Sequence, residues 1–314
     1  MAFKPPAAKT VTGRTPSPPP SPAPLPPKAK ANGGTGAVAT KPAAVAIATN
    51  AGFASMAGAG FENAGRDDFA IPFLVILQSG SPQCKRSDGA YIPGAAEGML
   101  LNSVTKQVID TATEQVIVVP CAYDRSFVEW VTREDGGGFV RQLPVAQGLE
   151  LQQQCERDEK NRDILPNGHQ LNDTRSFYVM VIDDAGNPTP AFLTMTSTQI
   201  KKAKQWLMQQ NLLKLKDGRG AAYTPPMFAA KWQVTTVPEQ NEKGSWYGWA
   251  FEFTEFFPSV DDPTFQAALL FHKSVTKGDV RVDLAKAGEV IDSETGEVTG
   301  NGTARSDKDP ARAM

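Results

Sequence analysis

Prolines are distributed unevenly along this chain, and their distribution limits where a folded body can lie. Eleven of the 25 prolines fall within residues 1–60, among Ala, Gly, Thr and Ser and without a periodic apolar pattern. Such a segment has no apolar face to bury, so folding would not offset its loss of conformational entropy. We therefore predict a disordered Pro/Ala-rich arm over 1–60, a β-rich globular domain over 61–275 and a flexible charged tail over 276–314.

Charge is segregated along the 314-residue chain, whose formal net charge is −2. Residues 1–60 carry six cations and no acid, whereas residues 61–275 carry 20 basic and 26 acidic side chains. A mildly acidic body is a poor fit to a protein that coats duplex DNA by charge alone. It is compatible with a protein that has a local basic groove.

Several classes of protein are disfavoured by what the sequence lacks. It has no apolar run approaching the roughly 20 residues that cross a bilayer, and no GxSxG, GxGxxG or GxxxxGK[ST] motif. The cysteines Cys84, Cys121 and Cys155 are far apart, and only His169 and His272 could add imidazole ligands to a zinc site. We expect a non-enzymatic protein without a cofactor, a metal or a membrane partner.

The body shows the alternation and turn signals of antiparallel hairpins. One hairpin is predicted from strands 177–182 and 191–196, and a second from strands 228–236 and 246–253 with a turn at 241–244. A helix follows the first hairpin, with Ile200, Ala203, Trp206, Leu207 and Gln210 on one face, and helical spacing recurs over 261–275. The polar, Gln-rich segment 146–176 indicates a long loop or insertion. The predicted class is α+β, with a β-rich antiparallel body that an OB-like barrel would satisfy.

Aromatic and basic side chains alternate along the predicted strand 123–133. A period of two places Tyr123, Arg125, Phe127 and Arg133 on one face. Two aromatic rings and two guanidinium groups on one face can stack on bases and contact phosphates, as in proteins that bind single strands. The alternative is ordinary packing of this face into the core, with the arginines at its rim.

Two further groups of residues are assigned to nucleic-acid binding. Lys201, Lys202 and Lys204 lie close together on the predicted helix, and Lys231 and Trp246 lie on the two strands of the second hairpin. A run of lysines is also what a solvated helix face contains, and tryptophans also fill cores. Both alternatives stay open from the sequence.

Several segments resemble a family of tailed-bacteriophage proteins. The resemblance covers roughly 67–257 and rests on IPFLVILQS at 71–79, KRSDG at 85–89, EGM at 97–99, VVPCAY at 118–123, FVEW at 127–130 and REDGGG at 133–138. It implies single-stranded DNA binding in phage replication or recombination. Phage single-strand binders commonly combine an OB-type barrel with an acidic C-terminal tail. Residues 307–314 are instead mixed in charge, so the resemblance does not extend to recruitment through such a tail.

The leading prediction is a sequence-tolerant, non-enzymatic single-stranded DNA-binding protein that acts in the host cytoplasm. Its expected partners are single-stranded DNA, replication or recombination proteins of the phage or host, and further copies of the chain. The alternative is a structural or assembly protein of the virion, for which a Pro/Ala-rich arm and a β-rich body fit equally well.

Overall fold

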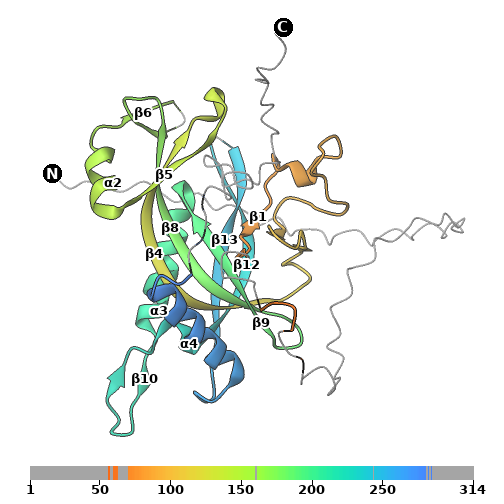
Figure 1. The fold of residues 1–314 in the computed structure, drawn as a ribbon, viewed down its shortest axis with the longest axis vertical. Helices are drawn as coiled ribbons and strands as arrows, with labels where there is room; N and C mark the ends of the chain where they lie inside the picture. The colour runs from red at the N-terminus through yellow and green to blue at the C-terminus, as the bar shows by residue number, and fades with distance from the viewer. Residues whose placement is uncertain are drawn as a thin grey trace, which may run out of the picture. The chain divides into compact units, whose positions relative to one another are not determined.

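The structure is a computed structural model that describes residues 56, 59–62, 70–159, 161–242, 244–280, 282 and 284 (Figure 1). The arm predicted over 1–60 and the tail predicted over 276–314 lie almost entirely outside the described residues. The description below concerns the body between them.

The body is built mainly of strands, with three α-helices among the described residues. The strands are β1 Leu74–Ile76, β2 Leu100–Asn102, β3 Val108–Ile109, β4 Val116–Val131, β5 Gly138–Pro144, β6 Glu156–Arg157, β7 Asp163–Ile164, β8 Gln170–Ile182, β9 Pro188–Met195, β10 Leu215–Lys216, β11 Ala222–Tyr223, β12 Ala230–Asn241 and β13 Gly244–Phe256. The helices are α2 Val145–Gln152, α3 Ile200–Leu212 and α4 Pro263–Thr276.

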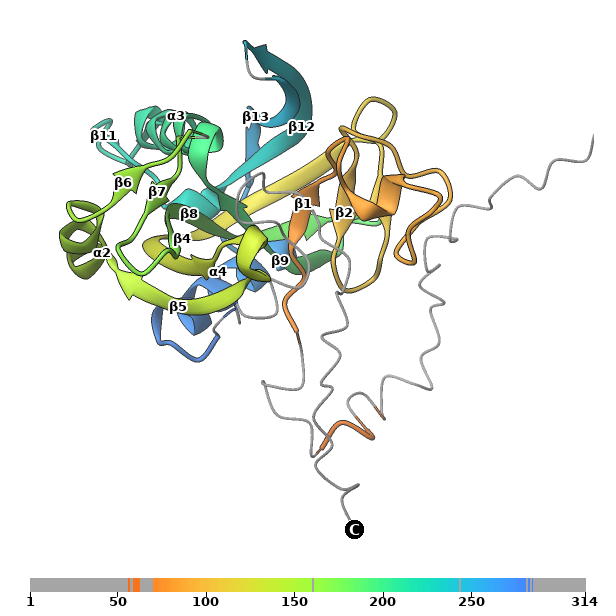
Figure 2. The same cartoon turned by 90° about the horizontal axis from the view of Figure 1, so that it is seen from above.

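One eight-stranded antiparallel sheet organises the body. Its order is β13-β12-β4-β8-β7-β6, with β5 also paired to β4 and β9 also paired to β8. Strands β4 and β8 form its long centre, and the sheet curls into a half-barrel around them (Figures 1 and 2). A three-stranded sheet, β1-β2-β3, and a two-stranded hairpin, β10-β11, complete the structure. The predicted α+β class with an antiparallel body is confirmed.

The helices cover opposite faces of the sheet. Ala203 and Trp206 of α3 pack in one hydrophobic cluster with Val179 of β8, whereas Ala268 of α4 packs in another with Met180. Because neighbouring residues of a strand point to opposite faces, α3 and α4 lie on opposite sides of β8. We call the side covered by α3 the inner face. Helix α2 also lies on the inner face. It covers Phe127 and Leu171, and Leu171 is an even number of residues from Val179 on β8, so both side chains point to the same side.

A β-bulge explains how the inner face stays continuous along β4. At the start of the strand the inner residues have even numbers, as Val118 shows, but further along they have odd numbers, as Tyr123 and Phe127 show. The register with β8 shifts between Pro120 and Ala122, which inserts the extra residue that changes the parity. The alternation predicted from Tyr123 is therefore correct as far as Val131, and it continues a strand that begins at Val116. The placement of Arg133 on this strand is wrong, because the strand ends at Val131 and Arg133 begins a short 3-10 helix, Arg133–Asp135.

The prediction of a loop over 146–176 is wrong. This segment contains most of α2, the short pair β6–β7 and the first half of β8. Most of its side chains are polar, yet residues 170–176 pair along their whole length with β4. The backbone pairing and the packing of α2 supply the order that the local composition does not suggest.

The end of the β12–β13 hairpin extends past β4, and two glutamine side chains hold it. Strand β12 pairs with β4 only through residues 232–234. Beyond that point the Gln78 amide donates to the Tyr247 carbonyl at 2.9 Å and accepts from the Tyr247 amide at 2.8 Å. The Gln199 carbonyl oxygen accepts from the Trp249 amide at 3.1 Å. These contacts satisfy backbone groups along the outer edge of β13 and fix α3 relative to the hairpin.

Candidate nucleic-acid interface

The packing of α3 determines which of its lysines reach solvent. Trp206 is fully buried, stacked on Phe251 with ring centroids 3.8 Å apart and set edge-on to Trp232 at 6.1 Å. The opposite side of the helix is exposed. Its exposed residues are Lys201, Lys204, Gln205, Met208, Asn211 and Leu212. The predicted apolar face of the helix is confirmed, and two of the three predicted lysines lie on its solvent side.

The third lysine and the predicted tryptophan meet at one carboxylate. Lys202 Nζ lies 2.6 Å from Glu239 Oε1, and Trp246 Nε1 donates to Glu239 Oε2 at 2.9 Å. Burial raises the pKa of Glu239, but the hydrogen bonds from Lys202 and Trp246 outweigh it and the pKa is lowered overall. A Cβ at Gly248 would lie 2.7 Å from Glu239 Oε2, so glycine leaves room for this contact. Lys202 and Trp246 thus join α3 to the β12–β13 hairpin through Glu239.

The β10–β11 hairpin, which follows α3 directly, adds further cations. It projects from the body at the lower end of Figure 1 and carries exposed Lys216 and Arg219. Its one acid, Asp217, accepts from the backbone amides of Arg219 and Ala221 at 2.8 and 2.9 Å and so closes the turn. Tyr223 on β11 is 46% exposed.

We call this group of residues the α3–hairpin surface. It consists of Lys201, Lys204, Lys214, Lys216, Arg219 and Tyr223. Of these, sequence reasoning assigned only Lys201 and Lys204 to nucleic-acid binding. A hairpin signal was present in the KDGRG turn at 216–220, and it would have pointed to Tyr223 as a residue on the returning strand.

The strand face of β4 does not form an open groove at Phe127. Its side chain is 0% exposed and packs with Leu143, Leu165 and Leu171 under α2. A Cβ at Gly148 of α2 would lie 2.1 Å from the Phe127 ring, which shows how closely the helix approaches. The assignment of Phe127 to base stacking is therefore wrong, because its ring has no free face.

The other residues predicted on this strand have different environments. Tyr123 is half-buried, with its ring centroid 5.1 Å from that of Phe177. Arg125 makes a two-pronged hydrogen bond to Asp173, at 3.1 Å from Nε and 2.9 Å from Nη2. The side chain of Arg133 lies outside the described residues.

Lys231 is removed from the other predicted residues. Its Nζ lies 2.7 Å from Glu255 Oε1 on β13 and 4.8 Å from the centroid of the Phe257 ring. It thus bridges β12 to β13 on the outer strands of the sheet, away from the solvent side of α3. The structure does not bring Lys231 together with the α3 lysines.

A buried carboxylate that sequence reasoning missed lies on the inner face. Glu129 accepts from Arg141 Nε at 2.6 Å and from Asn167 Nδ2 at 3.1 Å, and its Oε1 lies 2.7 Å from His169 Nδ1. His169 is therefore held by a carboxylate of the protein, although the residues around it in the sequence are mostly polar. Burial raises the pKa of Glu129, but hydrogen bonds from His169, Arg141 and Asn167 outweigh it and lower the pKa overall.

We expect Glu129→Gln to lower the free energy of unfolding by about 2–3 kcal/mol at neutral pH, because it weakens charge-assisted hydrogen bonds in a buried position. The folded protein holds the pKa of Glu129 below its ordinary value of 4.5. This contribution is therefore complete above pH 4.5 and is lost as the pH falls further.

Urea unfolding between pH 3 and pH 7 measures this effect, and Glu252→Gln at an exposed position of β13 is the matched control. The difference between wild type and Glu129→Gln should shrink on acidification. A difference that stays constant down to pH 3 would contradict this role for Glu129.

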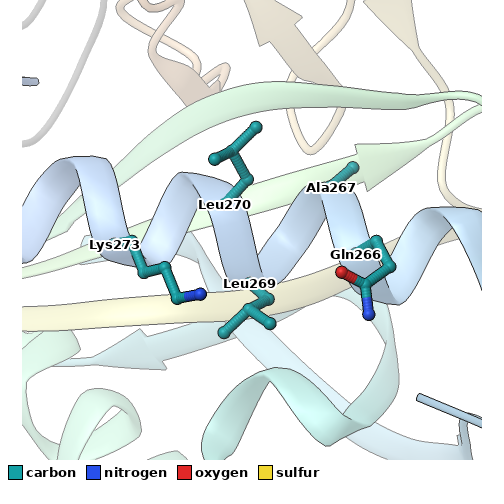
Figure 3. A pocket seen from close by; sticks show the side chains of 5 residues that line it. All are labelled: Gln266, Ala267, Leu269, Leu270 and Lys273. Atoms are coloured by element: carbon teal, nitrogen blue, oxygen red, sulfur yellow. The ribbon is translucent and has the colours of Figure 1, made fainter. Parts of the chain in front are cut away.

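Neither a metal site nor a membrane-spanning helix is found in the described part of the chain. There, no three His, Cys, Asp or Glu side chains gather as a metal would require, and no helix is long and apolar enough to cross a bilayer. A shallow hollow lies along α4 (Figure 3), lined by Gln266, Ala267, Leu269, Leu270 and Lys273. All five residues come from one helix, so the hollow lacks the convergent polar groups typical of a small-molecule site.

The fold and the α3–hairpin surface define a protein with a curled antiparallel sheet and one exposed basic helix–hairpin unit. Residues 40–281 match the family model described as Pam3 phage gp34-like protein. The chain belongs to this family of phage proteins, which confirms the phage character that its motifs indicate. No curated protein and no solved structure matches the chain. Binding of single-stranded DNA stays a prediction.

Proposed function

We propose that this phage protein binds single-stranded DNA without sequence preference, through the α3–hairpin surface, and that it does so without catalysing a reaction. The observation that carries the proposal is the positive charge of residues 197–224, the segment that contains the α3–hairpin surface. Residues 197–224 contain six cations and one acid, and that acid is held in the hairpin turn by backbone amides. Lys202 is paired with Glu239, which leaves five cations on the unit.

The arrangement of these side chains suits a single strand. Flexible lysines on α3 can follow a phosphate backbone, and the exposed ring of Tyr223 offers a face on which a base can stack. Met208 and Leu212, both more than half exposed, lie on the same side of α3 and add apolar surface. The acidic remainder of the body would direct the negatively charged strand to this unit. The proposed setting is phage replication or recombination in the host cytoplasm.

We expect Lys201→Gln combined with Lys204→Gln to weaken binding to a single-stranded oligonucleotide and to reduce its dependence on salt. Each phosphate contact to a single strand contributes about 0.7 to the slope of log K against log salt. Removing two contacts should therefore reduce that slope by about 1.4. Fluorescence anisotropy with a labelled oligonucleotide, over a series of salt concentrations, measures both effects.

The matched control is Lys273→Gln, an exposed lysine on α4 at the opposite face of the sheet, which should leave affinity and slope unchanged. A duplex of the same sequence tests the preference for single strands. Equal effects of the α3 and α4 variants would contradict the assignment of the site. No affinity for the oligonucleotide at low salt, together with recovery of the protein in purified particles, would favour the virion alternative.

A further inference from the structure

A second group of basic side chains lies on the inner face of the sheet, between the positions covered by α3 and α2. Arg125 of β4 and Arg175 of β8 are directly opposite each other in the strand register, so their side chains lie on the same face. Both reach the carboxylate of Asp173. Arg125 contacts it through Nε and Nη2, and Arg175 contacts it through Nη1.

Arg175 and Asp173 are well shielded from water, Arg125 is partly exposed, and all three are held by contacts with one another. The exposed fractions of the Arg175, Asp173 and Arg125 side chains are 5%, 16% and 31%. The guanidinium carbon of Arg125 also lies 5.5 Å from the centroid of the buried Phe127 ring. A two-pronged ion pair and an aromatic contact together restrict Arg125 to one orientation.

The group carries one positive charge that Asp173 does not balance. Two guanidinium groups meet one carboxylate, and the next acid on this face, Glu129, is bound to Arg141 and His169. Asp124 is exposed and lies on the opposite face of β4. Excess charge in a shielded position is unfavourable unless a counter-charge accompanies it. The arrangement therefore favours an anion.

Hydrogen-bond donors remain for such an anion. A guanidinium has five N–H groups, of which Asp173 accepts two from Arg125 and one from Arg175. Tyr123 lies two residues before Arg125 on β4 and therefore on the same face, where its hydroxyl is a further donor. Burial raises the pKa of Tyr123, and the nearby charges of Arg175 and Arg125 lower it to a smaller extent. The phenol thus stays protonated at neutral pH.

We propose that Arg125, Arg175 and Tyr123 form a phosphate-binding site, in which Asp173 positions the two arginines. Phosphate suits this site because its oxygens accept paired hydrogen bonds from a guanidinium fork. Arg125 is the more exposed of the two arginines, so phosphate would reach the site from the side of Arg125. The site is separate from the α3–hairpin surface and does not rest on the proposed function. A free phosphate ion and the phosphate of a nucleic acid share the chemistry that it recognises.

Calorimetric titration of the full chain with inorganic phosphate, at constant ionic strength against a chloride blank, tests this proposal. The wild type should show saturable binding, and Arg125→Gln should lower the affinity at least tenfold. That variant leaves a one-to-one pair between Arg175 and Asp173, so the fold is expected to persist. Arg157→Gln is the matched control, because Arg157 is also paired with an aspartate, Asp163, but lies on the short β6–β7 pair outside the proposed site.

Two results would overturn the site: no saturable binding by the wild type, or equal affinity in Arg125→Gln and the wild type. If Arg125→Gln does not fold, Arg125→Lys, which keeps the charge but removes the fork, should still lose affinity. Competition with oligonucleotides distinguishes the sources of phosphate. Competition only by a 5′-phosphorylated oligonucleotide indicates a strand end, competition also by the 5′-hydroxyl form indicates the backbone, and competition by neither indicates free phosphate.

The phosphate titration tests the Arg125–Arg175 site independently of the proposal that the α3–hairpin surface binds DNA. Loss of oligonucleotide binding in Lys201→Gln with Lys204→Gln, while phosphate titration is unchanged, would support both sites as separate units. Oligonucleotide binding that is insensitive to these lysines would contradict the α3–hairpin surface and leave the phosphate site standing.

Discussion

Phe127→Ala is expected to lower the free energy of unfolding by about 3–5 kcal/mol, the usual cost of removing a buried phenylalanine. Its ring is fully buried and packs with Leu143, Leu165 and Leu171 beneath α2. Because the ring offers no free face for a base, binding of single-stranded DNA through the α3–hairpin surface should be unchanged per folded molecule. Thermal or urea unfolding measures the first quantity, and anisotropy below the unfolding transition measures the second.

Gly148→Ala tests the same contact from the side of α2. The added Cβ would lie 2.1 Å from Cδ2 of Phe127, so helix and ring must move apart, at a cost of about 1–3 kcal/mol. In the background of Phe127→Ala the ring is gone, and Gly148→Ala should cost much less.

The opposite result for Phe127→Ala would be weaker DNA binding with an unchanged melting temperature. That result would restore the role of Phe127 in base stacking.

Trp206→Ala is expected to cost about 3–5 kcal/mol of stability, because this side chain joins α3 to the sheet. Its indole is fully buried and contacts the rings of Phe177, Trp232 and Phe251. Urea unfolding of wild type and variant measures the difference.

Trp206→Phe is the informative companion variant. The indole Nε1 of Trp206 is buried without a hydrogen-bond partner in the described structure, so its removal sacrifices no hydrogen bond. Phenylalanine keeps most of the ring contacts and should lose far less stability than alanine. If the two substitutions cost the same, the ring contacts do not hold the helix in place.

The local patterns predicted the hairpins and helices well because neighbouring residues determine them. The apolar stripe of α3 and the strands around the 183–188 turn follow directly from spacing. The alternation around Phe127 was also correct, but alternation shows only which residues share a face. That face is covered by α2, Leu143 and Leu165. Leu143 lies on a later strand, and Leu165 and most of α2 lie in the segment 146–176, whose composition predicts a loop.

For the charged residues, too, spacing in the sequence shows their position on an element but not the partners that folding brings to them. Lys202 and Trp246 look like free binding groups in the sequence, but folding brings Glu239 between them. Arg125 and Asp173 are 48 residues apart, and their pairing depends on the register of β4 with β8. Lys201 and Lys204 were assigned from spacing alone and are exposed as expected, because a helix places its polar side without help from distant residues.

One strand, β4, takes part in all four hydrophobic clusters of the body: Val118 belongs to the first, Val128 to the second, Val119 to the third and Phe127 to the fourth. No cluster can therefore separate from the others without breaking the hydrogen bonds of this strand. An opening that frees β4 itself disturbs all four clusters and should cost close to the free energy of complete unfolding. Backbone amides at both ends of β4 should exchange their hydrogens with solvent at one common, slow rate, whereas those of the projecting β10–β11 hairpin exchange independently.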